Sequence, residues 1–479
     1  MPLFSDSRYF LSKPRRSVWA SAILALSLAA SRTAVAQIPE PGLLTAARAD
    51  RLTGLYEFTD GTRLHVTDLA DVLGGRPVLS VTEYATGRLR GLYPQPAGHF
   101  TAGPSWFRKE PTAYSIQFEE TSGPAASLTL SEGDVTRRAR RVALIEKEIT
   151  LRSGGLTLAG TLVLPPGRGP HPAVVMVPGS GRLTRKTPRY FGDLIAARGV
   201  AVLVTDKRGA GGSGGDSNGL SHAEWAADVH AQLDWLKGQP GIDPARLGLV
   251  AGSESGYVAP VVAAARTDVR FLVCRVCPAL PHGVTIVDME SRAMRRRGLS
   301  EADVNRAADL LARLIRFAED RTGYAELAAI ATSGDGTRWR AAVPLSVIPP
   351  ADSGYWNRYR AVLDVDPREA YRRLKVPVLA ILGELDERVL IDRHLPAYEA
   401  LKSGGLDLTL WKIERASHGL LLDEATTPRY PEGLHDRLAE WIVHASGATT
   451  MGRPITLRAE PLWVPRPRLD AREGRRRRD

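Results

Sequence analysis

Apolar and polar residues divide the chain into two regions of different periodicity. In residues 50–145, short runs alternate apolar and polar side chains, and Asp-Gly and Thr-Gly turns separate them. This alternation predicts an antiparallel β-domain. From about residue 146, continuous apolar runs such as 174–177 and 200–204 alternate with stretches of helical periodicity such as 224–237. Such repeated strand–helix units predict an α/β fold with a doubly wound, mostly parallel sheet.

The same patterns set the expected domain boundaries. We expect an accessory antiparallel β-domain over residues 37–145 and an α/β domain over residues 146–446. The second domain contains a long insert at about 278–375, which exceeds the length of a simple connection. Residues 300–319 of this insert carry apolar side chains at helical spacing, so we expect a helical cap that limits access of substrate and water.

The net charge of +11 is concentrated at the two ends of the 479-residue chain. Residues 1–36 carry +4 and residues 451–479 carry +5, which leaves +2 for the body between them. A nucleic-acid-binding face would concentrate basic residues on a folded surface, so we expect no nucleic-acid partner. The segment 447–479, rich in Pro and Arg, is expected to be a disordered basic tail.

The first 36 residues have the three parts of a secretory signal peptide. Lys13, Arg15 and Arg16 precede a short apolar run over residues 18–30, and Ala34-Val35-Ala36 is typical of a cleavage site. We therefore expect export to the periplasm or the extracellular medium, with no stable membrane insertion after cleavage. Whether export uses the general secretory or the twin-arginine route stays open, and the sequence does not indicate an oligomeric state.

The two cysteines, Cys274 and Cys277, follow an apolar run and are expected to be buried strand residues. In an extended strand, residues three apart point to opposite faces, too far apart for a disulfide bond. No second Cys/His pair lies at zinc-ligand spacing, and the glycine-rich run 209–215 lacks the Lys of a phosphate loop. We therefore expect no metal site and no nucleotide-binding loop.

The segment LGLVAGSESGYVAP, residues 247–260, indicates a sharp turn between a strand and a helix with a serine at its apex. Such a nucleophile elbow requires small neighbours, and Ser253 is flanked by Ala251 and Ser255 at the positions usually held by glycine. Ser255 is the rival nucleophile. Choosing it would place the bulky Tyr257 where the turn requires a small residue, so we favour Ser253.

An acid and a histidine follow two later strand-like runs, in the order that a serine hydrolase requires. Asp386 follows the run 378–382, and His418 follows the run 408–413. His418 would accept the proton of Ser253, and Asp386 would hold the imidazole in the correct tautomer. Glu384 and Asp392 are alternative acids. Three other histidines in helix-like, charged segments are interpreted as surface groups: His394, His435 and His444.

These motifs together resemble the α/β-hydrolase superfamily over about residues 146–445. More narrowly, they resemble exported bacterial esterases related to the serine aminopeptidase-like and dienelactone hydrolase-like groups. The resemblance rests on five segments: VVMVPGSG (174–181), VLVTDKRGAGGSGG (202–215), LGLVAGSESGYVAP (247–260), VPVLAILGELD (376–386) and ASHG (416–419). The chain departs from the family pattern at Pro178, Gly252 and Ser255. The family implies hydrolysis of a carboxylic ester or related acyl bond without a cofactor.

An oxyanion hole needs two backbone donors close to the nucleophile. Such folds place one donor in the loop after the first long buried strand, where we choose Ser180 over Gly179 and Gly181. The other is the N–H of Glu254. Tyr355 and Trp356 are candidates for the substrate pocket, with aromatic packing inside the cap as the alternative. The loop 206–209 is interpreted as a salt-bridged structural loop.

The sequence therefore predicts a serine esterase that cleaves a small-molecule acyl ester through an acyl-enzyme. An aminopeptidase or amidase with the same triad is the alternative enzyme. A catalytically inactive hydrolase-like module that binds a ligand or partner is the alternative of a different class. Labelling of Ser253 by a fluorophosphonate would separate the enzymes from the binding module.

Overall fold

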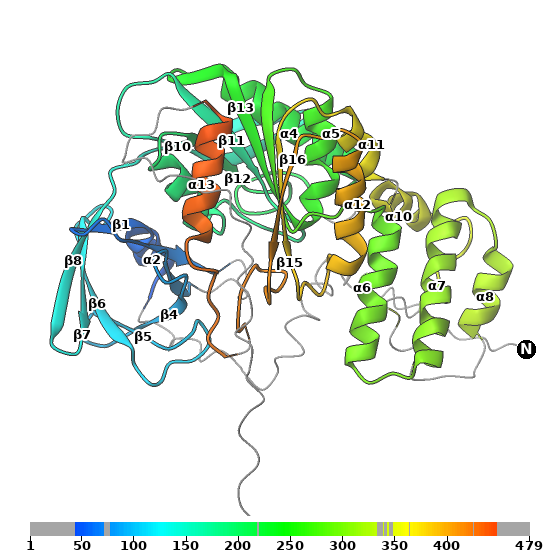
Figure 1. The fold of residues 1–479 in the computed structure, drawn as a ribbon, viewed down its shortest axis with the longest axis horizontal. Coiled ribbons are helices and arrows are strands. Elements are labelled where there is room, and N and C mark those ends of the chain that lie inside the picture. Colours follow the sequence, from blue (N-terminus) through cyan, green and yellow to red (C-terminus); the bar gives the residue numbers. More distant parts are fainter. Residues whose placement is uncertain are drawn as a thin grey trace, which may run out of the picture.

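The computed structural model describes residues 44–70, 77–217, 220–332, 339, 343, 348–363, 365–424 and 426–447. The expected signal peptide, and all but the first residue of the expected tail at 447–479, lie outside these residues. Two sheets dominate the fold, a closed barrel and an open eight-stranded sheet (Figure 1). Within the described residues, no helix has both the length and the apolar character needed to cross a bilayer.

The first sheet is a closed antiparallel barrel, in which β1 pairs with both β2 and β8. Inward-facing apolar residues fill it, including Tyr56, Phe100 and Phe118, because alternate residues of each strand point to the same face. The prediction of an antiparallel β-domain is confirmed. Its elements are α2 (Ala46–Leu52), β1 (Gly54–Phe58), β2 (Arg63–Asp68), β3 (Leu79–Glu83), β4 (Leu89–Pro94), β5 (Phe100–Ala102), β6 (Tyr114–Glu119), β7 (Ser127–Glu132) and β8 (Val135–Arg141).

The second sheet has the strand order β16-β15-β14-β13-β11-β12-β10-β9. From β16 to β12 all neighbours are parallel, whereas β10 pairs antiparallel with β12 and β9. The predicted mostly parallel α/β sheet is confirmed. Its strands are β9 (Ile145–Ser153), β10 (Leu156–Leu164), β11 (His171–Val177), β12 (Ala201–Thr205), β13 (Ile242–Gly252), β14 (Val269–Arg275), β15 (Val378–Gly383) and β16 (Leu408–Ile413).

Helices cover both faces of this sheet, because its strands are apolar on both sides. One face packs against the helices α4 (His222–Lys237), α5 (Ala259–Ala264), α11 (Pro367–Arg373) and α12 (Ile391–Ser403). The other face packs against α3 (Arg189–Ala196) and α13 (Leu434–Ala445). The carboxyl ends of the parallel strands are therefore left for the loops that carry the candidate site.

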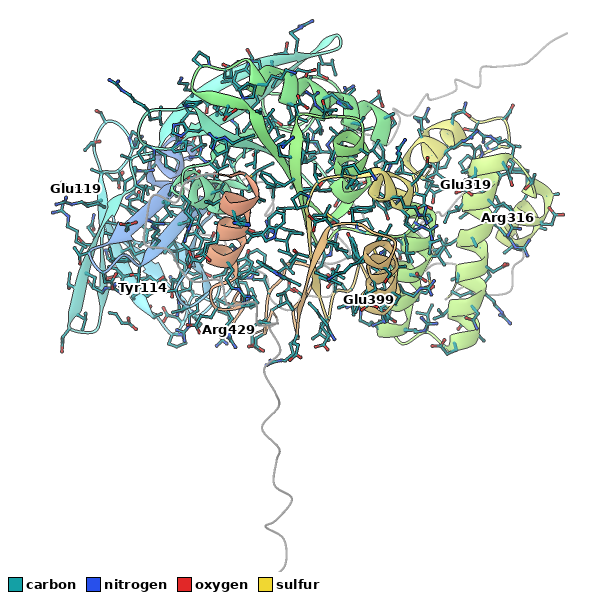
Figure 2. All side chains as sticks on the ribbon, turned by 45° about the horizontal axis from the view of Figure 1, so that its top comes forward. Tyr114, Glu119, Arg316, Glu319, Glu399 and Arg429 are labelled. Carbon is teal, nitrogen blue, oxygen red and sulfur yellow. The ribbon has the colours of Figure 1, made fainter. Side chains whose placement is uncertain are left out.

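The insert between β14 and β15 forms a helical cap with its own apolar core. The helices described there before α11 are α6 (His282–Arg296), α7 (Glu301–Asp320), α8 (Tyr324–Thr332) and α10 (Tyr355–Leu363). Phe317, Leu314 and Trp356 are buried in this core. Figure 2 shows the cap residues Arg316 and Glu319 at the opposite end of the molecule from Tyr114 and Glu119 of the barrel.

The barrel contacts the sheet domain through buried polar groups and through a short backbone contact. His65 of β2 hydrogen-bonds through Nε2 with the Asp193 carboxylate of α3, at 3.0 Å. The turn between β3 and β4 meets the segment after β16, where the Tyr430 N–H donates to the Gly87 carbonyl at 2.7 Å. The barrel therefore lies against the chain segment that follows His418.

Candidate active site

The candidate nucleophile lies at a strained turn between β13 and a short 3₁₀ helix, η1 (Ser253–Tyr257). Ser253 has φ 56°, a left-handed backbone conformation that residues other than glycine rarely adopt. Strain of this kind persists only where the surroundings fix the backbone. The predicted sharp turn between strand and helix is present, with Ser253 at its apex.

Two residues of the turn explain how this backbone is held. A Cβ atom on Gly256 would lie 2.5 Å from Cβ of Cys277, so this position requires glycine. The Ser255 side chain is fully buried, accepts a hydrogen bond from the Gly252 N–H at 2.8 Å and lies 3.1 Å from the Val177 carbonyl. Ser255 therefore stabilises the turn from inside, and its hydroxyl does not face a substrate.

The three residues predicted to react are connected by hydrogen bonds. His418 Nε2 lies 2.8 Å from Ser253 Oγ, and His418 Nδ1 lies 2.9 Å from each carboxylate oxygen of Asp386. Asp386 is buried, whereas the His418 side chain is 15% exposed. A buried carboxylate that accepts from Nδ1 fixes the tautomer that leaves Nε2 free to accept a proton.

The acid is held by the loop that follows β15. Asp386 Oδ1 accepts the backbone N–H groups of Arg388 and Val389 at 2.8 and 2.9 Å. Gly383, at the end of β15, is needed for close approach, because its Cβ would lie 2.5 Å from the carbonyl oxygen of Ala416 in the histidine loop. The two loops therefore pack directly against each other and present Asp386 to His418.

The two alternative acids have other partners. Glu384 accepts the backbone N–H of Arg415 at 2.9 Å, and Asp392 lies 3.4 Å from Arg292 of the cap. The structure brings Asp386, and neither of these, into hydrogen-bond contact with His418.

Backbone donors for an oxyanion lie on both sides of Ser253. A Cβ on Gly179 would lie 3.6 Å from Cβ of Ser253, so the loop after β11 touches the turn. Within the described residues, the N–H groups of Ser180 and Glu254 have no hydrogen-bond partner. Unpaired amides next to a nucleophile are what a developing oxyanion requires.

The Glu254 side chain points toward a group of rings between the turn and the cap. It is 26% exposed and lies 3.9 Å from Nε2 of the buried His222. His282 of the cap stacks on Tyr257 at a ring-centroid distance of 4.5 Å. Burial, followed by the charges of His282 and Lys207, lowers the pKa of His222 to about 3, so its ring is neutral at pH 7.

Two of the three histidines interpreted as surface groups need correction. His394 and His435 were predicted to be surface groups, but both are buried: His394 accepts the Ala279 N–H, and His435 packs against Tyr430. Only His444 is exposed among the three. His394 lies in α12 and His435 in α13. Both helices are more buried than their charged residues suggested, because each packs against a face of the sheet.

The cysteines are free and buried, as predicted, but the extended geometry expected for them is wrong. β14 ends at Arg275, and Val276 has φ 49°, so the chain turns between the two cysteines. Of the pocket candidates, Tyr355 is half-buried, whereas Trp356 is fully buried in the cap core and donates from Nε1 to the Pro350 carbonyl. For Trp356 the packing alternative is therefore correct.

The loop 206–209 contains the expected salt bridges, with one exception. Asp206 pairs with Arg185 and Arg208 with Asp228. Lys207 instead points toward the candidate site and donates to the Gly179 carbonyl, a contact that the sequence did not predict. The available signal was its position just after β12, at the same edge of the sheet as Ser253.

Among the residues that the structure describes, no group of three or more His, Cys, Asp or Glu side chains is placed to hold a metal ion. Fold and site geometry together define the class of this protein: it is a serine hydrolase of the α/β fold. A family profile described as X-Pro dipeptidyl-peptidase (S15 family) matches residues 154–419, more than half of the chain. The chain therefore belongs to this family.

Curated relatives match shorter stretches. The thiohydrolase aneE of Aspergillus aculeatus is 33% identical over 134 residues, 26% of this chain and 39% of that protein. An uncharacterised protein of Mycobacterium tuberculosis is 31% identical over 143 residues, 30% of this chain and 45% of its own length. The chain thus spans less than half of either relative.

Among the solved structures that the chain matches are two hydrolases from Pyrococcus. An esterase of Pyrococcus furiosus is 16% identical, with a TM-score of 0.42, and covers 64% of this chain and 93% of its own. The acylaminoacyl peptidase of Pyrococcus horikoshii is also 16% identical, with a TM-score of 0.42, over 83% of this chain and 57% of its own.

Proposed function

We propose that this protein hydrolyses a small carboxylic ester through a covalent acyl-enzyme on Ser253. The observation that supports this most is the unbroken hydrogen-bonded chain from Ser253 Oγ through His418 to Asp386. Ser253 Oγ would attack the ester carbonyl carbon while His418 Nε2 takes its proton. The carbonyl oxygen would then carry the negative charge between the N–H groups of Ser180 and Glu254.

The remaining steps use the same groups. Collapse of the tetrahedral intermediate breaks the bond to the alcohol, which leaves with the proton from His418. His418 then takes a proton from water, the hydroxide attacks the acyl-enzyme, and the acid is released as Ser253 recovers its proton. Asp386 stabilises the imidazolium in both half-reactions. No cofactor takes part in this sequence.

Family membership favours a second candidate, the cleavage of an amide bond after a dipeptide. The same triad would serve, but an amine is a poorer leaving group than an alcohol and depends more strongly on protonation by His418. A peptidase also needs contacts that hold the peptide on both sides of the scissile bond. The triad alone suffices to hydrolyse an activated ester. We therefore place ester hydrolysis before peptide cleavage as the proposed activity.

A labelling experiment tests the proposal directly. A fluorophosphonate should modify Ser253, and Ser253→Ala should lose both the label and about 10⁶-fold in kcat on a short-chain nitrophenyl ester. Ser255→Ala is the matched control and should keep the label. An unlabelled, inactive wild-type protein would refute the proposal and favour a binding module. Comparing an acetyl ester with a Gly-Pro anilide then decides between esterase and peptidase.

A further inference from the structure

The loop that follows β12 places one lysine against the loop that carries the Ser180 N–H, one of the two candidate oxyanion donors. Lys207 Nζ donates to the carbonyl oxygen of Gly179 at 3.0 Å, and its ammonium lies 3.6 Å from the ring centroid of Trp225. Only 7% of the residue is exposed. Within the described part of the chain, no carboxylate lies within salt-bridge distance of this ammonium. A buried cation without such a partner is costly, which suggests a role beyond packing.

The bond to Gly179 has a consequence for the next amide. The peptide bond between Gly179 and Ser180 is trans, since the cis bonds of the described residues lie elsewhere. In a planar trans amide the C=O and N–H point in opposite directions. When Lys207 holds the Gly179 carbonyl on one side, the Ser180 N–H is therefore fixed on the other. A cation on the carbonyl also polarises the amide and makes its N–H a stronger donor.

We propose that Lys207 is a positioning residue of the oxyanion hole, which fixes the Ser180 N–H through the Gly179 carbonyl. It does not touch the substrate. This inference rests on the proposed function, because it assigns Lys207 to the same hydrolytic site. It differs from a purely structural role in that the benefit is largest in the transition state, when the oxyanion forms.

The central test is Lys207→Met, which keeps the length and apolar stem but removes the ammonium. We expect kcat on a nitrophenyl ester to fall about 10- to 100-fold, with KM changed less than about twofold. Turnover is calculated per Ser253 labelled to completion by the fluorophosphonate, so that misfolded protein is not counted. Lys207→Arg, which keeps a cationic donor, should recover part of the loss. Lys237→Met, at the exposed end of α4, is the control.

The pH profile gives a second readout that does not depend on the folding of Lys207→Met. Burial lowers the pKa of Lys207, and the charge of Glu254 opposes this. The facing groups are Glu254 from η1, the neutral His222 from α4 and the uncharged ring of Trp225. As pH rises, kcat should therefore fall when Lys207 loses its proton. Arginine stays charged, so this alkaline limb should disappear in Lys207→Arg.

The outcomes separate the two proposals. A wild type that neither labels at Ser253 nor turns over ester refutes the proposed function itself. A wild type that labels, combined with unchanged turnover per labelled site in Lys207→Met, refutes only the role of Lys207. If Lys207→Met fails to fold, an alkaline limb that is the same in wild type and Lys207→Arg likewise refutes it.

Discussion

The barrel and the cap are attached to the same sheet domain by contacts of different kinds. At the barrel, His65 and Arg189 meet the buried Asp193 carboxylate, and Lys186 lies 3.3 Å from the buried Asp68. The cap instead has a separate apolar core around Phe317, and its contact with the turn that carries Ser253 is a stack of rings. Figure 1 shows the two at opposite ends of the sheet domain.

This difference indicates different tasks. Buried charges and backbone hydrogen bonds require one fixed geometry, since a displaced partner leaves a charge or an amide unpaired. Apolar and ring contacts tolerate small shifts at lower cost. We infer that the barrel is a rigid support behind the His418 loop, whereas the cap adjusts to the substrate. The barrel's attachment should therefore control stability and kcat, and the cap's should control KM.

The largest expected effect comes from removing the carboxylate at the barrel contact. Asp193→Ala removes the buried acceptor that Arg189 and His65 share, although Arg189 keeps its ion pair with Glu146, and we expect a loss of about 3–5 kcal/mol in the free energy of unfolding. Urea denaturation measures this. Asp309→Ala on the cap removes an exposed pair with Arg313 and should cost less than about 1 kcal/mol. Equal losses in the two variants would contradict the comparison.

The second prediction concerns the contact next to the histidine loop. Gly87 has φ 70°, and a Cβ there would lie 2.1 Å from the Tyr430 carbonyl oxygen. Gly87→Val should push the barrel away from the segment after His418 and lower kcat about 10- to 100-fold, because small displacements of a reacting group are costly. Steady-state kinetics checks this.

Gly98→Val is the matched control for that experiment. Gly98 also lies in the barrel and has φ 84°, but nothing lies within 4 Å of the added Cβ. It therefore introduces similar backbone strain without the clash. If both variants lower kcat equally, the barrel's contact with Tyr430 does not support His418.

Acid should weaken the barrel contact through the same carboxylate. Burial alone would raise the pKa of Asp193, but the Arg189 charge and the hydrogen bond from His65 lower it to about 2. The lowered pKa stabilises the fold above the unfolded value of 3.8, and this contribution is lost as pH falls toward 2. Between pH 5 and pH 2.5, wild type should lose about 2 kcal/mol more than Asp193→Asn. Parallel stability curves for the two proteins would contradict this.

The order of the elements and the three residues at the strand ends could be predicted from sequence, because both depend on local signals. Buried parallel strands are continuous apolar runs, and the residues directly after them meet at one edge of the sheet. This is why Ser253, Asp386 and His418, far apart in the chain, were selected together. Their hydrogen bonds, in contrast, depend on loop geometry that only the structure shows.

Long-range packing explains what the sequence did not indicate. His435 lies in a charged stretch, yet it is buried because α13 packs between the sheet and rings that include Tyr84 of the barrel. The position just after β12 did not single out Lys207, because three adjacent charged side chains share it and the sequence does not tell which of them faces the loop at Gly179. The closure of the barrel likewise depends on a long-range pairing, because β1 and β8 are the first and the last strands of this domain.

The smallest expected effect tests the cap. His282 is half-buried, stacks on Tyr257 and lies 5.3 Å from the ring of His222, so it is the cap's ring contact with the turn that carries Ser253. His282→Ala should cost about 1 kcal/mol of stability, raise KM about threefold and leave kcat within about twofold, because the cap would bind substrate less well without moving Ser253. Val284→Ala, on an exposed face of α6, is the control. A loss in kcat at unchanged KM would show that the cap, like the barrel, holds the reacting groups, and the distinction between the two attachments would fail.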